Sequence, residues 1–186
     1  MAEPVLISPP LTDEMVSGLR AGTRVLISGR VFTARDAAHK KMVALLEQGK
    51  ELPIDLSNQI IYYVGPSPAR PGRIIGACGP TTSGRMDSYT PQLLGRGLKG
   101  MIGKGFRSPD VIQALQEYRA VYFAAVGGAG ALLSGCVRAA EVVAYPELGP
   151  EAIHELTVVN FPAIVVNDIY GGDLYREGCR QYAVNK

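Results

Sequence analysis

Arg35 lies in the segment TARDAAHKK, at the point where a helix is expected to begin. A cation there is mildly unfavourable, by about 0.3–1 kcal/mol, because the helix dipole is positive at this end. The free backbone amides of the same helix start accept carboxylates or phosphates readily. The segment therefore suits an anion held jointly by these amides and Arg35. The alternative is that Arg35 simply pairs with Asp36 or another acid.

A second candidate segment, GPTTSGRMD at residues 79–87, directly follows the apolar stretch IIGAC. Three consecutive hydroxyl residues, Thr81, Thr82 and Ser83, are flanked by glycines, and Arg85 closes the turn. Such a loop offers many hydrogen-bond donors at the end of a strand, where α/β proteins tend to bind ligands. A carboxylate would fit this loop, although hydroxyl residues are also common in turns for purely local hydrogen bonding.

Lys104 lies between two glycines in the segment GRGLKGMIGKG, residues 95–105. Residues 95–100 form a literal GxGxxG, but they follow a helical pattern and precede a strand, the reverse of the order that dinucleotide binding requires. Nor does Lys104 complete a phosphate-binding loop, because Gly105 stands where Ser or Thr is needed. The glycines let the backbone and the ammonium approach a ligand closely, the alternative being a solvated loop lysine.

The remaining candidates carry weaker signals. His39 follows Arg35 by about one helical turn, on the face that they share, and a histidine on a helix surface is more often structural than catalytic. The glycines at residues 127–130 either expose amides to an anion, leave room for a partner's backbone or only make a tight turn. The three cysteines are far apart and form no CxxC pair, so neither a disulfide framework nor a metal or cluster site within this chain is indicated.

Composition bounds the class of protein. With 186 residues, 47% hydrophobic and 19% charged, the chain is an ordinary folded protein of a size that favours one domain, residues 1–186. A formal net charge of +2 is far from the strongly basic balance of nucleic-acid binders. The apolar runs are shorter than the roughly 18 residues of a membrane span, and the N-terminus does not resemble a secretory signal. We therefore expect a cytoplasmic protein that binds neither nucleic acid nor membrane.

The candidate residues must be positioned by alternating strands and helices. The patterns predict strands near residues 24–31, 59–64, 73–78, 100–102, 121–126, 142–148 and 161–168. They predict helices near residues 34–48, 85–94 and 109–118, the first with a capping box at Thr33 and Asp36 and the last capped by Ser108. Residues 59–64 and 73–78 are expected to form a β-hairpin around a proline-rich loop. This order indicates a layered α/β domain with a mixed sheet.

Four segments taken together resemble one known family: TARDAAHKKM at 33–42, GPTTSGRMD at 79–87, TPQLL at 90–94 and MIGKG at 101–105. Their order and spacing are similar to those in the C-terminal domain of class I fumarases and in the beta subunit of their two-chain relatives. The similarity continues through VYFAAVGGAGALL and covers nearly the whole chain, so it is far more specific than any single motif. It implies a swivelling β/β/α layered domain with a mixed sheet.

The resemblance also implies a cofactor and a partner. In that family the domain closes over a [4Fe-4S] cluster whose cysteines belong to the alpha subunit, and an iron without a protein ligand acts as a Lewis acid on the substrate hydroxyl. Arg35, Arg85 and Lys104 then match the cations that hold the carboxylates of a small dicarboxylate. Each charge-assisted bond in such a closed site contributes about 1.5–3 kcal/mol.

Thr81 matches the hydroxyl that the family places near the carbon that gains or loses a proton, and it is the candidate catalytic base. A threonine hydroxyl is a poor base unless its neighbours activate it, so positioning a water or relaying a proton stays an open alternative. The resemblance implies that Asp36, His39 and Thr82 support the site without touching the substrate, Asp36 and His39 by orienting Arg35.

The resemblance thus predicts a hydro-lyase subunit, the beta subunit of a class I fumarate hydratase, which interconverts fumarate and L-malate. It would be inactive alone and would work with the alpha subunit as an αβ or α2β2 assembly. Beta subunits of L(+)-tartrate dehydratase are similar as well, but they tend to depart from TARD and GRMD, which are both intact here. A stand-alone dicarboxylate-binding or regulatory module is the alternative from another class.

Overall fold

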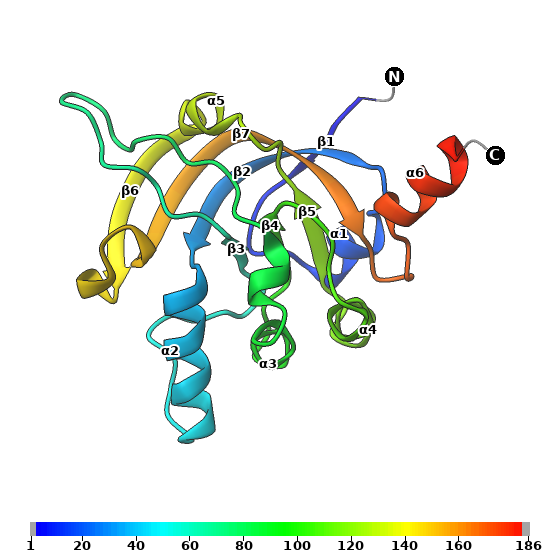
Figure 1. Cartoon of the computed structure of the whole chain (residues 1–186), viewed down its shortest axis with the longest axis horizontal. Coiled ribbons are helices and arrows are strands. Elements are labelled where there is room, and N and C mark those ends of the chain that lie inside the picture. The colour runs from blue at the N-terminus through cyan, green and yellow to red at the C-terminus, as the bar shows by residue number, and fades with distance from the viewer. Residues whose placement is uncertain (1–2, 184–186) are drawn as a thin grey trace.

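The computed structural model describes residues 3–183, which build a seven-stranded sheet (Figure 1). The strand order is β1-β2-β3-β4-β5-β7-β6, and β2 also pairs with β7. The strands are β1 Val5–Ile7, β2 Arg24–Thr33, β3 Ile60–Tyr62, β4 Gly100–Gly103, β5 Val121–Ala124, β6 Val137–Ala144 and β7 Ile153–Asn167. Neighbours from β1 to β5 pair in parallel, whereas β7 runs antiparallel to β2, β5 and β6. The expected mixed α/β class is confirmed.

The sheet closes on itself into a small barrel. β7 is 15 residues long, and its pairing with β2 includes Arg24 opposite Ile164 and Phe32 opposite Glu155. The end of the same strand pairs with β5, where Ala124 lies opposite Ile164. Because β2, β3, β4 and β5 are parallel neighbours, β7 completes a ring of five strands. The carboxyl ends of the four parallel strands therefore meet at one edge of the ring.

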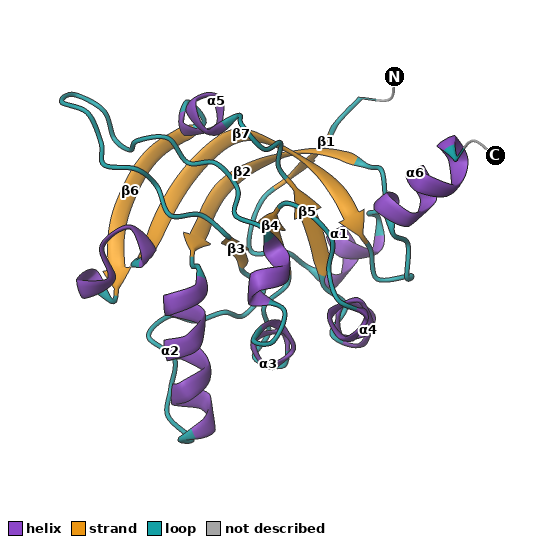
Figure 2. Cartoon of the chain, in the orientation of Figure 1, coloured by secondary structure: helices purple, strands orange, loops and turns teal. Residues whose placement is uncertain are grey.

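Helices lie on both sides of this sheet (Figure 2). The α-helices are α1 Asp13–Ser17, α2 Asp36–Glu47, α3 Thr90–Leu94, α4 Pro109–Glu117, α5 Gly130–Ser134 and α6 Leu174–Tyr182, and 3-10 helices lie at η1 Ser83–Met86 and η2 Pro146–Glu151. Figure 2 shows α2, α3 and α4 on one side of the sheet and α5 on the other. One apolar cluster, with Tyr62 and Phe161, fills the ring, and a second, with Met42 and Met101, packs between sheet and helices. β3 is therefore buried on both faces, as expected of a central parallel strand.

The predicted capping box of α2 is wrong. Thr33 is the last residue of β2, and its hydroxyl oxygen accepts a hydrogen bond from His154 N at 3.0 Å instead of capping the helix. Arg35 precedes the helix in an extended conformation and provides no side-chain cap. Glu151 caps the helix from another part of the chain, because its carboxylate accepts from Ala37 N at 3.0 Å. A tertiary contact has replaced the local one that the spacing predicts.

The predicted hairpin of residues 59–64 and 73–78 is also wrong. Only β3 forms, and it pairs in parallel with β2 on one side and with β4 on the other. Because both of its edges are occupied, residues 73–78 cannot pair beside it. They belong instead to the long arm that projects from the sheet in Figure 1, where Ser67 N donates to Ala77 O at 3.0 Å between the two sides of the arm.

The other predicted elements overlap those of the structure. α4 begins with Pro109 and is capped by Ser108, as predicted. The helix expected at residues 85–94 is divided into η1 and α3, β7 begins well before residue 161, and β1, α1 and α6 were not predicted. Within residues 3–183, no helix is both long and apolar enough to cross a membrane.

Candidate functional site

The candidate residues lie where the parallel strands end. Arg35 follows β2, Thr81 and Arg85 lie in the connection that leaves β3, and Lys104 follows β4. Gly127 stands in the turn after β5. These connections meet at one edge because their strands are parallel neighbours. Such an edge of an α/β sheet is a common place for ligands, since loops from several strands surround it.

Arg35 and Arg85 are joined through one carboxylate. Arg85 Nε donates to Asp36 Oδ1 at 2.8 Å, and Arg35 Nε lies 3.6 Å from Asp36 Oδ2. Glu151 provides a second acid, whose Oε1 lies 3.5 Å from Arg35 Nη2. The alternative that Arg35 pairs with nearby acids is thus realised. Arg85 is 52% exposed and, among the described residues, donates only through Nε, so its two Nη groups can still meet a carboxylate.

Gly65 lets Arg35 lie against the backbone that leaves β3. A Cβ on Gly65 would lie 2.9 Å from Arg35 Nη1 and 3.1 Å from Pro150 O, both too close for an undisturbed contact. The Arg35 side chain is 23% exposed as a result of this close packing. A larger residue at position 65 would therefore displace the guanidinium.

Thr81 and Lys104 are held together by their backbones. Lys104 N donates to Thr81 O at 3.2 Å, and Thr81 N donates to Tyr63 O at 2.7 Å. Thr82 forms a parallel bridge with Lys104 and is itself exposed. The Lys104 ammonium nitrogen lies 3.9 Å from the position that a Cβ on Gly127 would take, so the Lys104 side chain runs beside the turn after β5. In the part of the chain that the structure describes, Lys104 forms no ion pair, unlike the two arginines.

The expectation that His39 lies on the surface of its helix is wrong. The side chain is fully buried against Tyr63 and Tyr89, with ring centroids 5.2 and 6.2 Å away. Burial lowers the pKa of His39 to about 4, so the ring is neutral at pH 7. Its Nδ1 lies 2.9 Å from Arg35 O, and since a carbonyl only accepts, Nδ1 carries the hydrogen. His39 therefore supports the backbone of Arg35 from inside the fold.

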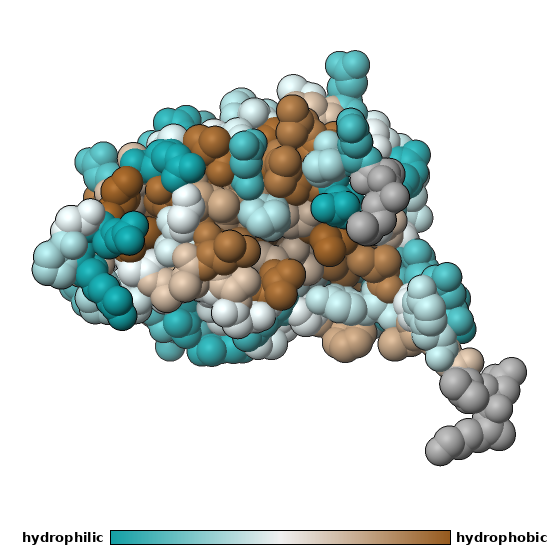
Figure 3. Space-filling model, turned by 90° about the horizontal axis from the view of Figure 1, so that it is seen from above, coloured by the Kyte–Doolittle hydropathy of each residue, from teal (hydrophilic) through white to brown (hydrophobic). Residues whose placement is uncertain are grey.

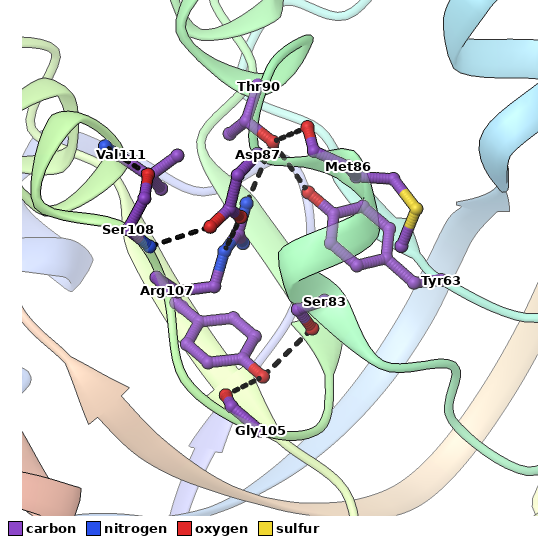
Figure 4. A network of polar contacts seen from close by, with 10 residues as sticks. Tyr63, Ser83, Met86, Asp87, Thr90, Gly105, Arg107, Ser108 and Val111 are labelled. Atoms are coloured by element: carbon purple, nitrogen blue, oxygen red, sulfur yellow. Dashed lines mark hydrogen bonds and ion pairs between the residues drawn. The ribbon is translucent and has the colours of Figure 1, made fainter.

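Sequence reasoning missed a buried arginine beneath the same loops. The Arg107 side chain is inaccessible, and its Nε donates to Asp87 Oδ1 at 2.7 Å (Figure 4). Its Nη2 donates to Thr90 Oγ1 at 2.8 Å, and Asp87 Oδ2 accepts from Ser108 N at 2.6 Å. The available signal was the charge of Asp87 at the end of GPTTSGRMD, but no spacing rule pairs it with Arg107. Glu151 was missed for the same reason.

The cysteines and acids of this chain do not fit an iron–sulfur cluster. Within residues 3–183, no group of three or more His, Cys, Asp or Glu side chains could hold a metal ion. Cys78 is buried, Cys136 is half-buried and Cys179 is exposed, and burial raises the pKa of Cys78 to about 11. A cluster requires several thiolates at one place. The described residues therefore cannot hold such a cluster by themselves.

The fold and the edge define an α/β domain whose cation-rich loops suit a small anion. The family model described as Fumarase C-terminus matches residues 2–178, and the chain belongs to that family. The resemblance found in the four sequence segments is thereby confirmed.

Relatives of two lengths share this domain. The aerobic class I fumarate hydratase of Salmonella typhimurium (strain LT2) is 37% identical over 175 residues, which are 92% of this chain and 30% of that protein. The anaerobic class I fumarate hydratase of Escherichia coli (strain K12) is 39% identical over 165 residues, 88% of this chain and 30% of that protein. A putative L(+)-tartrate dehydratase subunit beta of Methanocaldococcus jannaschii is 37% identical over 173 residues, 90% of this chain and 89% of that protein. The chain thus spans under a third of the two fumarate hydratases and nearly all of the beta subunit.

Proposed function

We propose that this chain is the beta subunit of a class I fumarate hydratase, which hydrates fumarate reversibly to L-malate together with a cluster-bearing alpha subunit. The observation that carries the proposal is that Arg35, Thr81, Arg85 and Lys104 all follow parallel strands that end at one edge. Family membership supports it, because relatives with this domain are named fumarate hydratases. The lyase would act in the cytoplasm as an αβ or α2β2 assembly and would be inactive as a single subunit.

In this proposal the three cations hold a small dicarboxylate. Lys104, which lacks an acidic partner among the described residues, attracts one carboxylate, and the Nη groups of Arg85 bind the other. Because Asp36 accepts from Arg85 through Nε, the substrate shares Arg85 with Asp36 and does not displace it. Arg35, held between Asp36 and Glu151, adds positive potential behind the substrate.

Thr81 would place its hydroxyl beside the reacting carbon. Its backbone is fixed by hydrogen bonds to Tyr63 and Lys104. The described residues form no hydrogen bond with the hydroxyl, so within residues 3–183 no neighbour activates it as a strong base. Thr81 therefore orients a water or relays a proton in this proposal, and it acts as the base only where the partner supplies an activating group.

The partner would bring the cofactor and close the site. A [4Fe-4S] cluster bound by the alpha subunit supplies a Lewis-acidic iron. Residues 1–186 would form one domain, a swivelling β/β/α layer that closes over the substrate. Exposed apolar side chains support a partner, since Leu6, Val126 and Leu132 are 73%, 67% and 71% exposed. Apolar side chains also gather on the face that Figure 3 shows from above.

A second candidate is the beta subunit of L(+)-tartrate dehydratase. The relative from Methanocaldococcus jannaschii, which this chain matches over nearly its full length, is named as such a subunit. The intact TARD and GRMD segments favour fumarate. Assays of fumarate, L-malate and L(+)-tartrate on one reconstituted complex separate the two candidates.

Co-expression with the cluster-bearing chain tests the proposed function. The complex should hydrate fumarate, and Arg85→Ala or Lys104→Ala should severely reduce that activity. Normal turnover in either variant would remove the proposed role of the residue. Binding of L-malate to the isolated chain in calorimetry, without activity in any complex, would instead favour a stand-alone dicarboxylate-binding or regulatory module.

A further inference from the structure

We propose that the ion pair between Arg107 and Asp87 is a positioning device that locks the loop carrying Thr81 and Arg85 to the loop carrying Lys104. The inference rests on the proposed function for the roles of those three residues, whereas the lock itself is a property of this chain. The side chains of Arg107 and Asp87 are 0% and 14% exposed. They act through other residues and are positioning residues, because a substrate at the edge cannot reach the buried guanidinium.

Backbone hydrogen bonds join the two loops near the residues where each loop begins. The first loop, residues 79–87, carries Thr81 and Arg85, and the second loop, residues 103–108, connects β4 to α4. Lys104 N donates to Thr81 O at 3.2 Å, and Ser83 N donates to Lys104 O at 2.8 Å. These bonds fix the start of each loop. They leave the far end of the first loop, where Arg85 lies, to be held by something else.

The ion pair supplies that second attachment. Arg107 Nε in the second loop donates to Asp87 Oδ1 at the end of the first loop, at 2.7 Å. Asp87 Oδ2 accepts in return from Ser108 N at 2.6 Å. Arg107 Nη2 also donates to Thr90 Oγ1, whose hydroxyl donates to Met86 O at 2.9 Å. Arg85 lies two residues before Asp87 and Lys104 three residues before Arg107, so a shift of the pair moves both candidate cations.

Two tyrosines hold the guanidinium in place. The Arg107 guanidinium carbon lies 5.4 Å from the centroid of the Tyr63 ring and 5.0 Å from that of Tyr122. Tyr122 OH donates to Gly105 O at 2.9 Å and lies 2.9 Å from Ser83 Oγ, so it joins the same two loops. Arginine suits this site because its cation lies within cation–π distance of both rings while its planar guanidinium donates to two acceptors. A lysine at position 107 would keep the positive charge but would lack the planar guanidinium that donates to two acceptors at once.

The Arg107–Asp87 pair has no net charge, so it is suited to positioning the loops and not to attracting an anionic substrate. Asp87 compensates Arg107 at close range, so the pair adds little field at the edge. A buried ion pair is also a poor way to gain stability, because an apolar pair of similar size often stabilises as much. The pair does supply a directional connection between two loops, which an apolar contact would not.

Hydrogen exchange of the full chain tests the lock without any activity. Asp87→Asn keeps the size of the side chain but removes its charge. The matched control is Asp168→Asn, since Asp168 is 3% exposed and accepts from Ala21 N at 2.8 Å at the other edge of the ring, before β2. The amides of Ser83 and Lys104 should exchange about tenfold faster or more in Asp87→Asn than in the control, compared at equal distance below each melting temperature. Equal acceleration in both variants, or none, would overturn the proposal.

Kinetics of the complex with the cluster-bearing chain provide the second test. Asp87→Asn should raise the KM for the dicarboxylate about tenfold, with Arg107→Lys intermediate and Asp168→Asn unchanged. A KM that stays normal in Asp87→Asn, while the melting temperature falls as in the control, would reduce the pair to a purely structural role. If the wild-type complex hydrates no dicarboxylate, the proposed function fails, and the exchange measurement still decides whether the lock exists.

Discussion

Two arginine–aspartate pairs lie near the same edge, with nearly equal lengths and different surroundings. Arg85 Nε lies 2.8 Å from Asp36 Oδ1, and these side chains are 52% and 30% exposed. Arg107 Nε lies 2.7 Å from Asp87 Oδ1, and these are 0% and 14% exposed. Exposed pairs contribute little to stability and exchange partners easily. A buried pair is hard to break, because either partner alone would be an uncompensated charge.

The comparison teaches that burial, and not the length of the bond, separates the two roles. The exposed pair can present its cation to a carboxylate while Asp36 keeps it oriented. The buried pair cannot take a new partner and can only hold the loops around it. The following substitutions break or sharpen this difference, starting with the largest expected effect.

Breaking the buried pair should destabilise the chain most. Arg107→Met leaves Asp87 without its partner and should lower the free energy of unfolding by about 3–5 kcal/mol. Arg85→Met removes an exposed partner and should lower it by less than about 1 kcal/mol. Urea denaturation of both variants, followed by circular dichroism, measures the two losses. Similar losses would show that burial does not distinguish the pairs.

Substitutions of Arg85 in the exposed pair should lower the activity of the complex, although they hardly change the stability of the chain. In the reconstituted complex, Arg85→Ala should lower kcat/KM by about 10-fold to 150-fold, because charge-assisted bonds to the substrate that stabilise the transition state by about 1.5–3 kcal/mol are lost. Arg85→Lys keeps the positive charge but loses the bidentate guanidinium, so its kcat/KM should lie between those of Arg85→Ala and the wild type. A Lys variant as poor as the Ala variant would mean that bidentate geometry matters more than charge.

The stability of the fold should depend on pH through the buried side chain of His39. Burial lowers the pKa of His39 in the folded chain to about 4, below the ordinary 6.5 of an unfolded histidine. Between these values the unfolded chain binds more protons, so stability falls as the pH drops from 6.5 to 4, by up to about 3 kcal/mol. Urea denaturation at several pH values should show this slope in the wild type and a weaker slope in His39→Gln. An unchanged slope in His39→Gln would contradict the assignment.

The smallest effect is expected at Gly65. Gly65→Ala brings a methyl group to 2.9 Å from Arg35 Nη1, so the guanidinium must shift, at a cost of about 1 kcal/mol. The KM of the complex should then rise several-fold. Gly178→Ala in α6 is the control, because a Cβ there meets nothing within 4 Å, and its KM should match the wild type. A normal KM in Gly65→Ala would argue against a role for Arg35 in binding.

The predictions from sequence succeeded where a local pattern was sufficient. Ser108 and Pro109 mark the start of α4 through a cap and a preset backbone angle, and both act within one helical turn. The hairpin failed because its second strand depended on whether β3 had a free edge. His39 was misplaced for a similar reason, since Tyr63 and Tyr89 cover it from other elements.

The sequence by itself determined which residues carry the charges and hydroxyls, the family they indicate and the alternation of strands and helices. Only the tertiary structure decided the closure of the ring and the partner of each charge. Asp36 meets Arg85 across 49 positions and Asp87 meets Arg107 across 20. The physical reason is that local patterns act through neighbours within a turn or a strand. Pairing between distant residues follows instead from which strands lie side by side and in what register, and that depends on burial and backbone hydrogen bonding over the whole chain.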